Sequence, residues 1–137
     1  MLTMIIDEYD KAYFEFHQGL LNAFIEQVKE QPPFNLEHPD IEDSEFLSQL
    51  IALEHIGGSE HLIQGQALIC KIVAAYPHLM PILPRDLLWF FGGDCLHYMP
   101  DDEIAIFQSI DEKREEAKKS STEFSYIDTR KSALRLH

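Results

Sequence analysis

Apolar residues recur at three- and four-residue steps along most of the chain, which is the spacing of an amphipathic α-helix. The first segment with this spacing covers residues 4 to about 30. Pro32-Pro33 ends it, because proline lacks the N–H that a helix needs. A second helix is predicted to begin at a cap supplied by Asp43 or Ser44 and to stop at Gly57-Gly58. Sustained alternation with a period of two residues is missing, so no strand is expected.

The third predicted helix runs from Ser59 to about Tyr76, and residues 67–75 within it are apolar on nearly every side. A helix of this kind either lies at the centre of a domain or buries one of its faces against another subunit. The pattern therefore predicts a homodimer that covers part of this helix or part of the C-terminal segment.

The remaining pattern predicts two more helices and a tail. Pro84 suits the first turn of a helix over residues 85–91, which Gly92-Gly93 interrupts, and a last amphipathic helix runs from Pro100 to about Lys119. The fold class is therefore predicted to be all-α, a compact bundle of about five helices with a Gly-Gly-interrupted central segment. The expected domain organisation is a helical bundle over residues 1–120 and a C-terminal segment, 121–137, that docks on the body or on a partner.

Charge narrows the range of partners. The chain has 137 residues, a net charge of −13 and a hydrophobic content of 45%, which suffices for a real core in one domain. The last 25 residues carry seven bases and four acids, a net charge of +3, whereas residues 1–112 carry four bases and twenty acids, a net charge of −16. So acidic a body repels phosphate, which argues against nucleic-acid binding.

Membrane and secreted classes are also disfavoured. No apolar run reaches the ~18 residues of a membrane span, and the first residues lack the basic start of a secretory signal. Cys70 and Cys95 form no C-x-x-C motif and do not indicate a disulfide framework. A cytoplasmic protein without membrane contact is therefore expected.

Possible chemistry concentrates in residues 87–103, which hold the single tryptophan. If Asp94 opens a helical turn, Asp94 and His97 share a face and can act as a base with an orienting acid, or as metal ligands. The simpler interpretation makes Asp94 a helix cap and the aromatic side chains part of the core. The alternative is a pocket built from Arg85, Trp89, Asp94, His97 and Asp101.

Two further acid–imidazole pairs, Glu54-His55 and Glu60-His61, flank Gly57-Gly58. Neighbouring residues on a helix point about 100° apart, so neither pair chelates a metal by itself. All four are expected to be solvated turn residues, and neither a metal nor a cofactor is predicted.

Residues 83–107, which run Leu-Pro-Arg-Asp-Leu-Leu-Trp-Phe-Phe-Gly-Gly-Asp-Cys-Leu-His-Tyr-Met-Pro-Asp-Asp-Glu-Ile-Ala-Ile-Phe, resemble a small uncharacterised family of acidic proteobacterial proteins. The resemblance implies a bacterial cytoplasmic protein and brings no activity, cofactor or catalytic residue with it. The apolar third helix and tail favour a non-catalytic protein that acts through protein–protein contact, as a homodimer or with another protein. The alternative is an enzyme or small-ligand-binding protein with a pocket around Trp89, Asp94, His97 and Asp101.

Overall fold

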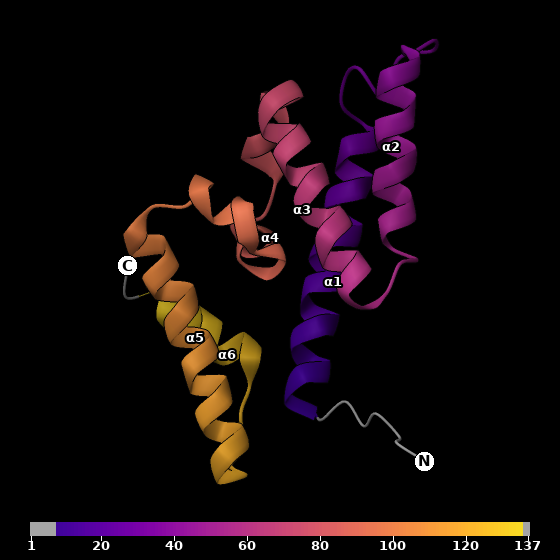
Figure 1. Cartoon of the computed structure of the whole chain (residues 1–137). Helices are drawn as coiled ribbons and strands as arrows, with labels where there is room; N and C mark the ends of the chain where they lie inside the picture. Colours follow the sequence, from indigo (N-terminus) through magenta and orange to yellow (C-terminus); the bar gives the residue numbers. More distant parts are fainter. Residues whose placement is uncertain (1–7, 136–137) are drawn as a thin grey trace, which may run out of the picture. The chain divides into compact units, whose positions relative to one another are not determined.

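The chain is mostly helical in the part that the computed structural model describes, residues 8–135 (Figure 1). No strand occurs among these residues, so the all-α prediction is confirmed. They form six α-helices and two 3-10 helices: α1 (Glu8–Lys29), α2 (Ile41–Leu53), α3 (Gly58–Ala75), η1 (Pro77–Ile82), α4 (Arg85–Phe91), η2 (Gly93–Tyr98), α5 (Asp101–Ser120) and α6 (Tyr126–Arg135).

The predicted number of about five helices is wrong. The proline-rich link after α3 and the segment after Gly92 each close into a short 3-10 helix, and the tail contributes α6. Such short 3-10 pieces are common as connectors between longer helices and leave little periodicity in a sequence. The predicted start of the first helix, at residue 4, lies outside the described residues.

Local chemistry accounts for most helix boundaries. α2 begins at Ile41, so Asp43 lies in its first turn and does not cap it. α3 begins at Gly58, whose φ of +65° is readily adopted by glycine. α5 ends at Ser121, a left-handed residue with φ of 53°, and the backbone N–H groups of Ser121 and Thr122 bond to the carbonyls of Lys118 and Ala117. This is the Schellman pattern, which satisfies carbonyls that a helix end leaves open.

The chain divides into two compact units. Among the described residues, the first unit combines 8–16 with 99–135, and the second is His17–Tyr98. Helix α1 thus contributes its first part to one unit and its remainder to the other. The predicted domain boundary at residue 120 stays a prediction. None of the described helices is long and apolar enough to cross a membrane.

In the first unit, α5 and α6 pack together beside the start of α1. Tyr126 of α6 is buried, and its ring lies 5.4 Å from the ring of Tyr13 and 5.2 Å from that of Phe16. The guanidinium of Arg114 lies 4.1 Å from the centre of the Tyr13 ring. Aromatic and cation–π contacts therefore hold α5 and α6 against the start of α1.

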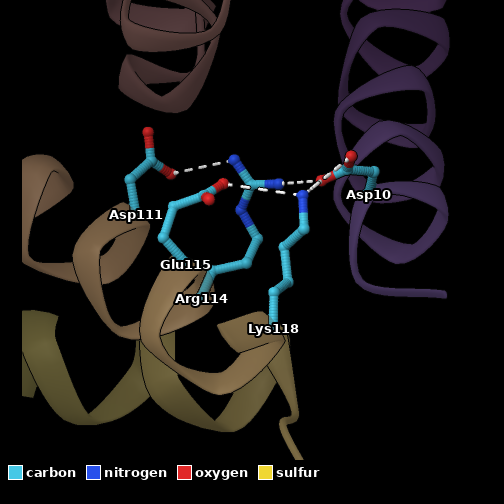
Figure 2. Close-up of polar contacts among 5 residues, drawn as sticks. All are labelled: Asp10, Asp111, Arg114, Glu115 and Lys118. Carbon is cyan, nitrogen blue, oxygen red and sulfur yellow. Dashed lines mark hydrogen bonds and ion pairs between the residues drawn. The ribbon is translucent and has the colours of Figure 1, made fainter. Parts of the chain in front are cut away.

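A small charge network reinforces this contact (Figure 2). Arg114 and Lys118 of α5 both donate to the carboxylate of Asp10 on α1. On the α5 side, Asp111 lies 3.9 Å from Arg114, and Glu115 lies 3.7 Å from Lys118. The Arg114 side chain is only 11% exposed. Because the network is partly shielded from water, it is worth more than a surface ion pair.

In the second unit, the remainder of α1 buries side chains that include Phe24, Ile25 and Val28. Helices α2 and α3 lie side by side (Figure 1). Tyr76, at the end of α3, donates a 2.6 Å hydrogen bond to the carboxylate of Asp43 in the first turn of α2. Burial and this hydrogen bond raise the pKa of Tyr76 to about 12.

Candidate functional site

The predicted central interruption forms the turn between α4 and η2. α4 ends at Phe91, and Gly92 and Gly93 follow with φ of +66° and +55°. Helix α3 holds this turn closely: the Gln66 side chain donates a 2.8 Å hydrogen bond to the Phe91 carbonyl. A Cβ on Gly93 would come within 2.5 Å of the Gln66 amide oxygen. The positive φ favours glycine here, and a larger residue would also displace the Gln66 amide from its bond to Phe91.

Asp94 and His97 share a face of η2, as their spacing predicts, with Asp94 Oδ1 and His97 Nε2 3.9 Å apart. Asp94 lies inside the helix, after Gly93, and not at its N-cap. Both side chains are open to water, 84% exposed for Asp94 and 79% for His97. A general base works best where its hydrogen bonds are preorganised and water is excluded. This pair lacks such enclosure.

The other predicted site residues occupy different surroundings. The Arg85 guanidinium donates a 2.9 Å hydrogen bond to the Tyr98 carbonyl and so ties α4 to the end of η2. Trp89 is half-buried on α4. Asp101 is exposed at the start of α5 and belongs to the first unit, whereas the other four residues belong to the second. A pocket shared by all five residues stays a prediction.

His61 is not the solvated turn residue that its sequence neighbours suggest. Because α3 begins at Gly58, His61 shares the buried face that Gly65 and Leu68 continue. Its Nδ1 lies 3.0 Å from the Leu53 carbonyl oxygen, and its Nε2 lies 3.3 Å from the Gln18 side-chain nitrogen. The ring is thus fixed inside the second unit as a structural group.

The other members of the two acid–imidazole pairs do not surround His61 with ligands. His55 and Glu60 are exposed and Glu54 is half-buried. Over residues 8–135, no group of three His, Cys, Asp or Glu side chains is placed to hold a metal ion. The absence of a metal requirement stays a prediction.

Two cysteines that look unrelated in the sequence meet in the structure. Cys95 of η2 is fully buried, and its thiol lies 4.0 Å from the Gln66 carbonyl oxygen on α3. Cys70, on the next turn of α3, is half-buried, and it is near enough to Cys95 and Tyr98 to help raise the pKa of both groups. Burial first, and the neighbouring Cys70 second, raise the pKa of Cys95 to about 12.

An open groove runs between α2 and α3. It has a volume of about 380 Å³ and is lined by Glu42, Glu45, Phe46, Gln49, Ala67, Leu68 and Lys71. Beyond its first turn, α3 has exposed positions at Ile63, Ala67, Lys71, Ala74 and Ala75, and Ile63 is 59% exposed. We call this groove, together with the exposed positions of α3, the α2–α3 face. The apolar run at residues 67–75 indicated such a face, but the groove depends on α2.

The first unit has a pocket that the sequence did not indicate. Its volume is about 600 Å³, and it is lined by Glu8, Tyr9, Ala12, Ser121, Thr122, Glu123, Phe124 and Ser125. A 2.6 Å hydrogen bond from the Tyr9 hydroxyl to the Thr122 carbonyl closes one side. Helix α1 and the segment before α6 build this pocket, and their contact cannot be inferred from local periodicity.

Comparison with known proteins gives one family. The model of a family described as PA2817-like matches residues 9–137. Searches of curated proteins and of solved structures give no match.

Proposed function

The chain belongs to the PA2817-like family, and we propose that it acts through protein–protein contact by forming a homodimer through the α2–α3 face. The observation that carries this proposal is the exposed apolar strip on α3, with Ile63 59% exposed and Ala67 one turn later. Residues four apart on a helix lie on the same face. The strip is therefore continuous with the groove that Ala67 lines.

The opposite side of α3 already has its partners. Gly65, Leu68, Ile69 and Ile72 are buried within the second unit. An amphipathic helix that packs on one side only is expected to be polar on the other. Helix α3 instead also exposes apolar side chains at Ile63 and Ala67, between Glu60 and Lys71. Exposed apolar surface of this kind is typical of an interaction site.

The groove also offers charges of both signs. Lys71 lies in it with Glu42 and Glu45. In a two-fold symmetric contact the same patch is used by both subunits, so Lys71 of one protomer can meet Glu42 or Glu45 of its partner. Such pairing offsets part of the repulsion between two chains that each carry a net charge of −13. A second copy of this chain therefore suits the charges of the face.

The alternative function, an enzyme or small-ligand-binding protein around Trp89, Asp94, His97 and Asp101, has less support. An active site needs polar groups that converge in a space from which water is excluded. Asp94 and His97 instead project into solvent from η2. Their 3.9 Å separation is explained by their spacing on a helical turn.

Sedimentation velocity over a range of micromolar concentrations tests the proposal. The parent chain is expected to exceed its monomer mass of 15.9 kDa, and Ile63→Asp and Ala67→Glu are expected to sediment as monomers. Ile127→Asp is the matched control, because Ile127 is 52% exposed but lies on α6. A parent that stays monomeric at every concentration contradicts the proposal. So does a dimer that Ile127→Asp dissociates and Ile63→Asp leaves intact.

A further inference from the structure

The packing of η2 on α3 brings the two cysteines of the chain together. In an α-helix, the carbonyl of Gln66 accepts the backbone N–H of Cys70, four residues later. The Cys95 thiol lies 4.0 Å from that same carbonyl oxygen. Its sulfur therefore rests against the turn of α3 that carries Cys70, and Cys70 is near enough to help raise the pKa of Cys95.

The backbone around this contact is held in place. The Gln66 side chain binds the Phe91 carbonyl, and Gly93 approaches Gln66 so closely that a Cβ there would collide with it. At the other end of η2, Arg85 binds the Tyr98 carbonyl. Because both ends of η2 are fixed, the nearness of Cys95 to Cys70 belongs to the fold and does not depend on a rare conformation.

We propose that Cys70 and Cys95 form a site of reversible oxidative modification, at which a hydroperoxide closes an intramolecular disulfide between α3 and η2. The proposal is independent of homodimer formation. It assigns different roles to the two thiols, because Cys70 is half-buried whereas Cys95 is fully buried. Accessibility makes Cys70 the thiol that meets the oxidant, and Cys95 the one that resolves the product.

Closure of the disulfide needs no reactant other than the two thiols and the peroxide. The Cys70 thiolate attacks one oxygen of hydrogen peroxide, the O–O bond breaks, and the released hydroxide takes up the thiol proton as water. The sulfur of Cys95 then attacks the sulfur of the Cys70 sulfenic acid; its S–H proton and the departing hydroxide form a second water. Two thiols and one peroxide thus give one disulfide and two waters, and a thiol reductant reverses the change by exchange.

The burial of Cys95 also determines how the rate of closure depends on pH. Because burial raises the pKa of Cys95 to about 12, this thiol is protonated at neutral pH and attacks slowly. The sulfenic acid on Cys70 is therefore expected to persist long enough to be trapped by dimedone. As the pH rises above neutral, the thiolate fraction of Cys95 grows tenfold per pH unit, and the second step is expected to accelerate in proportion.

The test uses the full reduced chain treated with hydrogen peroxide, quenched by alkylation in denaturant and analysed by intact mass. The expected product has lost two hydrogens and takes up no alkyl group, and peptide mapping joins Cys70 to Cys95. Dimedone is expected to label Cys70 at neutral pH, with less labelling at higher pH. The measurement on the parent chain needs no variant, so it is informative even if a cysteine variant folds poorly.

Two controls separate geometry from mere thiol content. Cys70→Ser is expected to leave Cys95 unoxidised, because it is fully buried. The double variant Cys70→Ser/Ala74→Cys keeps two thiols but moves one to the next turn of α3, at an exposed position. It is expected to lose the intramolecular disulfide. The proposal is overturned if Cys70 of the parent is consumed to sulfinic acid or to intermolecular disulfides, if both thiols stay alkylatable, or if the moved thiol closes equally fast.

Discussion

One substitution made at two glycines of the second unit is expected to give opposite results. Gly19 on α1 and Gly65 on α3 both lie inside helices, where replacement by alanine removes the excess backbone freedom of glycine. A Cβ at Gly19 meets nothing within 4 Å. A Cβ at Gly65 would lie 2.1 Å from Cε1 of Phe91 and 2.3 Å from its Cδ1. Helix propensity favours both changes, and packing opposes only the second.

The magnitudes follow from these two terms. Replacing glycine by alanine inside a helix stabilises it by ~1 kcal/mol, so Gly19→Ala is expected to raise the free energy of unfolding by about this amount. At Gly65, ordinary contact begins near 3.4 Å, so the Phe91 ring must retreat by more than ~1 Å. Phe91 is buried and packs against Phe90 and His61, at 5.1 and 5.3 Å between ring centres.

A ring so enclosed cannot retreat without disturbing its neighbours. Overpacking of this kind costs ~1–3 kcal/mol, and the upper end applies because the ring is confined on several sides. After subtraction of the propensity gain, Gly65→Ala is expected to lower the free energy of unfolding by ~2 kcal/mol. The two alanine variants should therefore differ by ~3 kcal/mol, which corresponds to melting temperatures ~10 °C apart in a chain of this length.

Urea unfolding followed by circular dichroism measures both variants against the parent. Phe91→Leu provides the internal check, because a smaller side chain at 91 is expected to reduce the cost of Gly65→Ala in a double-mutant cycle. A Gly65→Ala variant as stable as Gly19→Ala would falsify the close approach of Phe91 to α3. If Gly65→Ala lowers the free energy of unfolding equally in the parent and in Phe91→Leu, the destabilisation comes from some other contact of Gly65.

Three further outcomes are expected. The pKa of Tyr76 is raised from 10.0 to about 12, so the contribution of Tyr76 to the free energy of unfolding is complete below pH 10 and is lost as the pH rises towards 12. In the parent this loss should reach ~3 kcal/mol. Urea titrations repeated across that pH range should show a smaller loss for Tyr76→Phe. Asp10→Asn removes the negative charge that Arg114 and Lys118 share, and it should lower the free energy of unfolding by ~1–2 kcal/mol in the same assay. A decrease below ~0.5 kcal/mol would show that water screens the network. Asp94→Ala should change the free energy of unfolding by less than ~0.5 kcal/mol, because the Asp94 side chain is exposed to solvent and Asp94 is not the N-cap of η2. A loss of ~1 kcal/mol or more in thermal melts would support the interpretation of Asp94 as a helix cap.

Periodicity in the sequence located the long helices because burial of one face is a local property of each segment. The predicted breaks at Gly57-Gly58 and Gly92-Gly93 fall where the structure ends or starts helices, since glycine reaches positive φ without a steric penalty. Asp43 was misplaced as a cap because a carboxylate near a helix start looks the same whether it caps the helix or, as here, accepts a bond from Tyr76.

Contacts between distant segments carried no such local signal. His61 looked like a turn residue beside Gly57-Gly58, and its burial depends on Leu53, Gln18 and the rings after α4. The meeting of Cys70 and Cys95 likewise depends on how η2 packs against α3. Among the candidate site residues, the Asp94–His97 contact was set by local spacing, and the two side chains are found 3.9 Å apart.

The apolar composition of α3 is explained by the different contacts that its sides make. At about 100° per residue, Gly65 and Ala67 point in nearly opposite directions on α3, whereas Cys70 lies only about 60° from Ala67. Phe91 closes on Gly65, whereas Ala67 lines an open groove. The Gly65 side therefore has an internal partner, and the Ala67 side is left for an external partner. Because Ile63 lies about two turns before Cys70, Ile63→Asp should abolish association without changing how Cys70 oxidises.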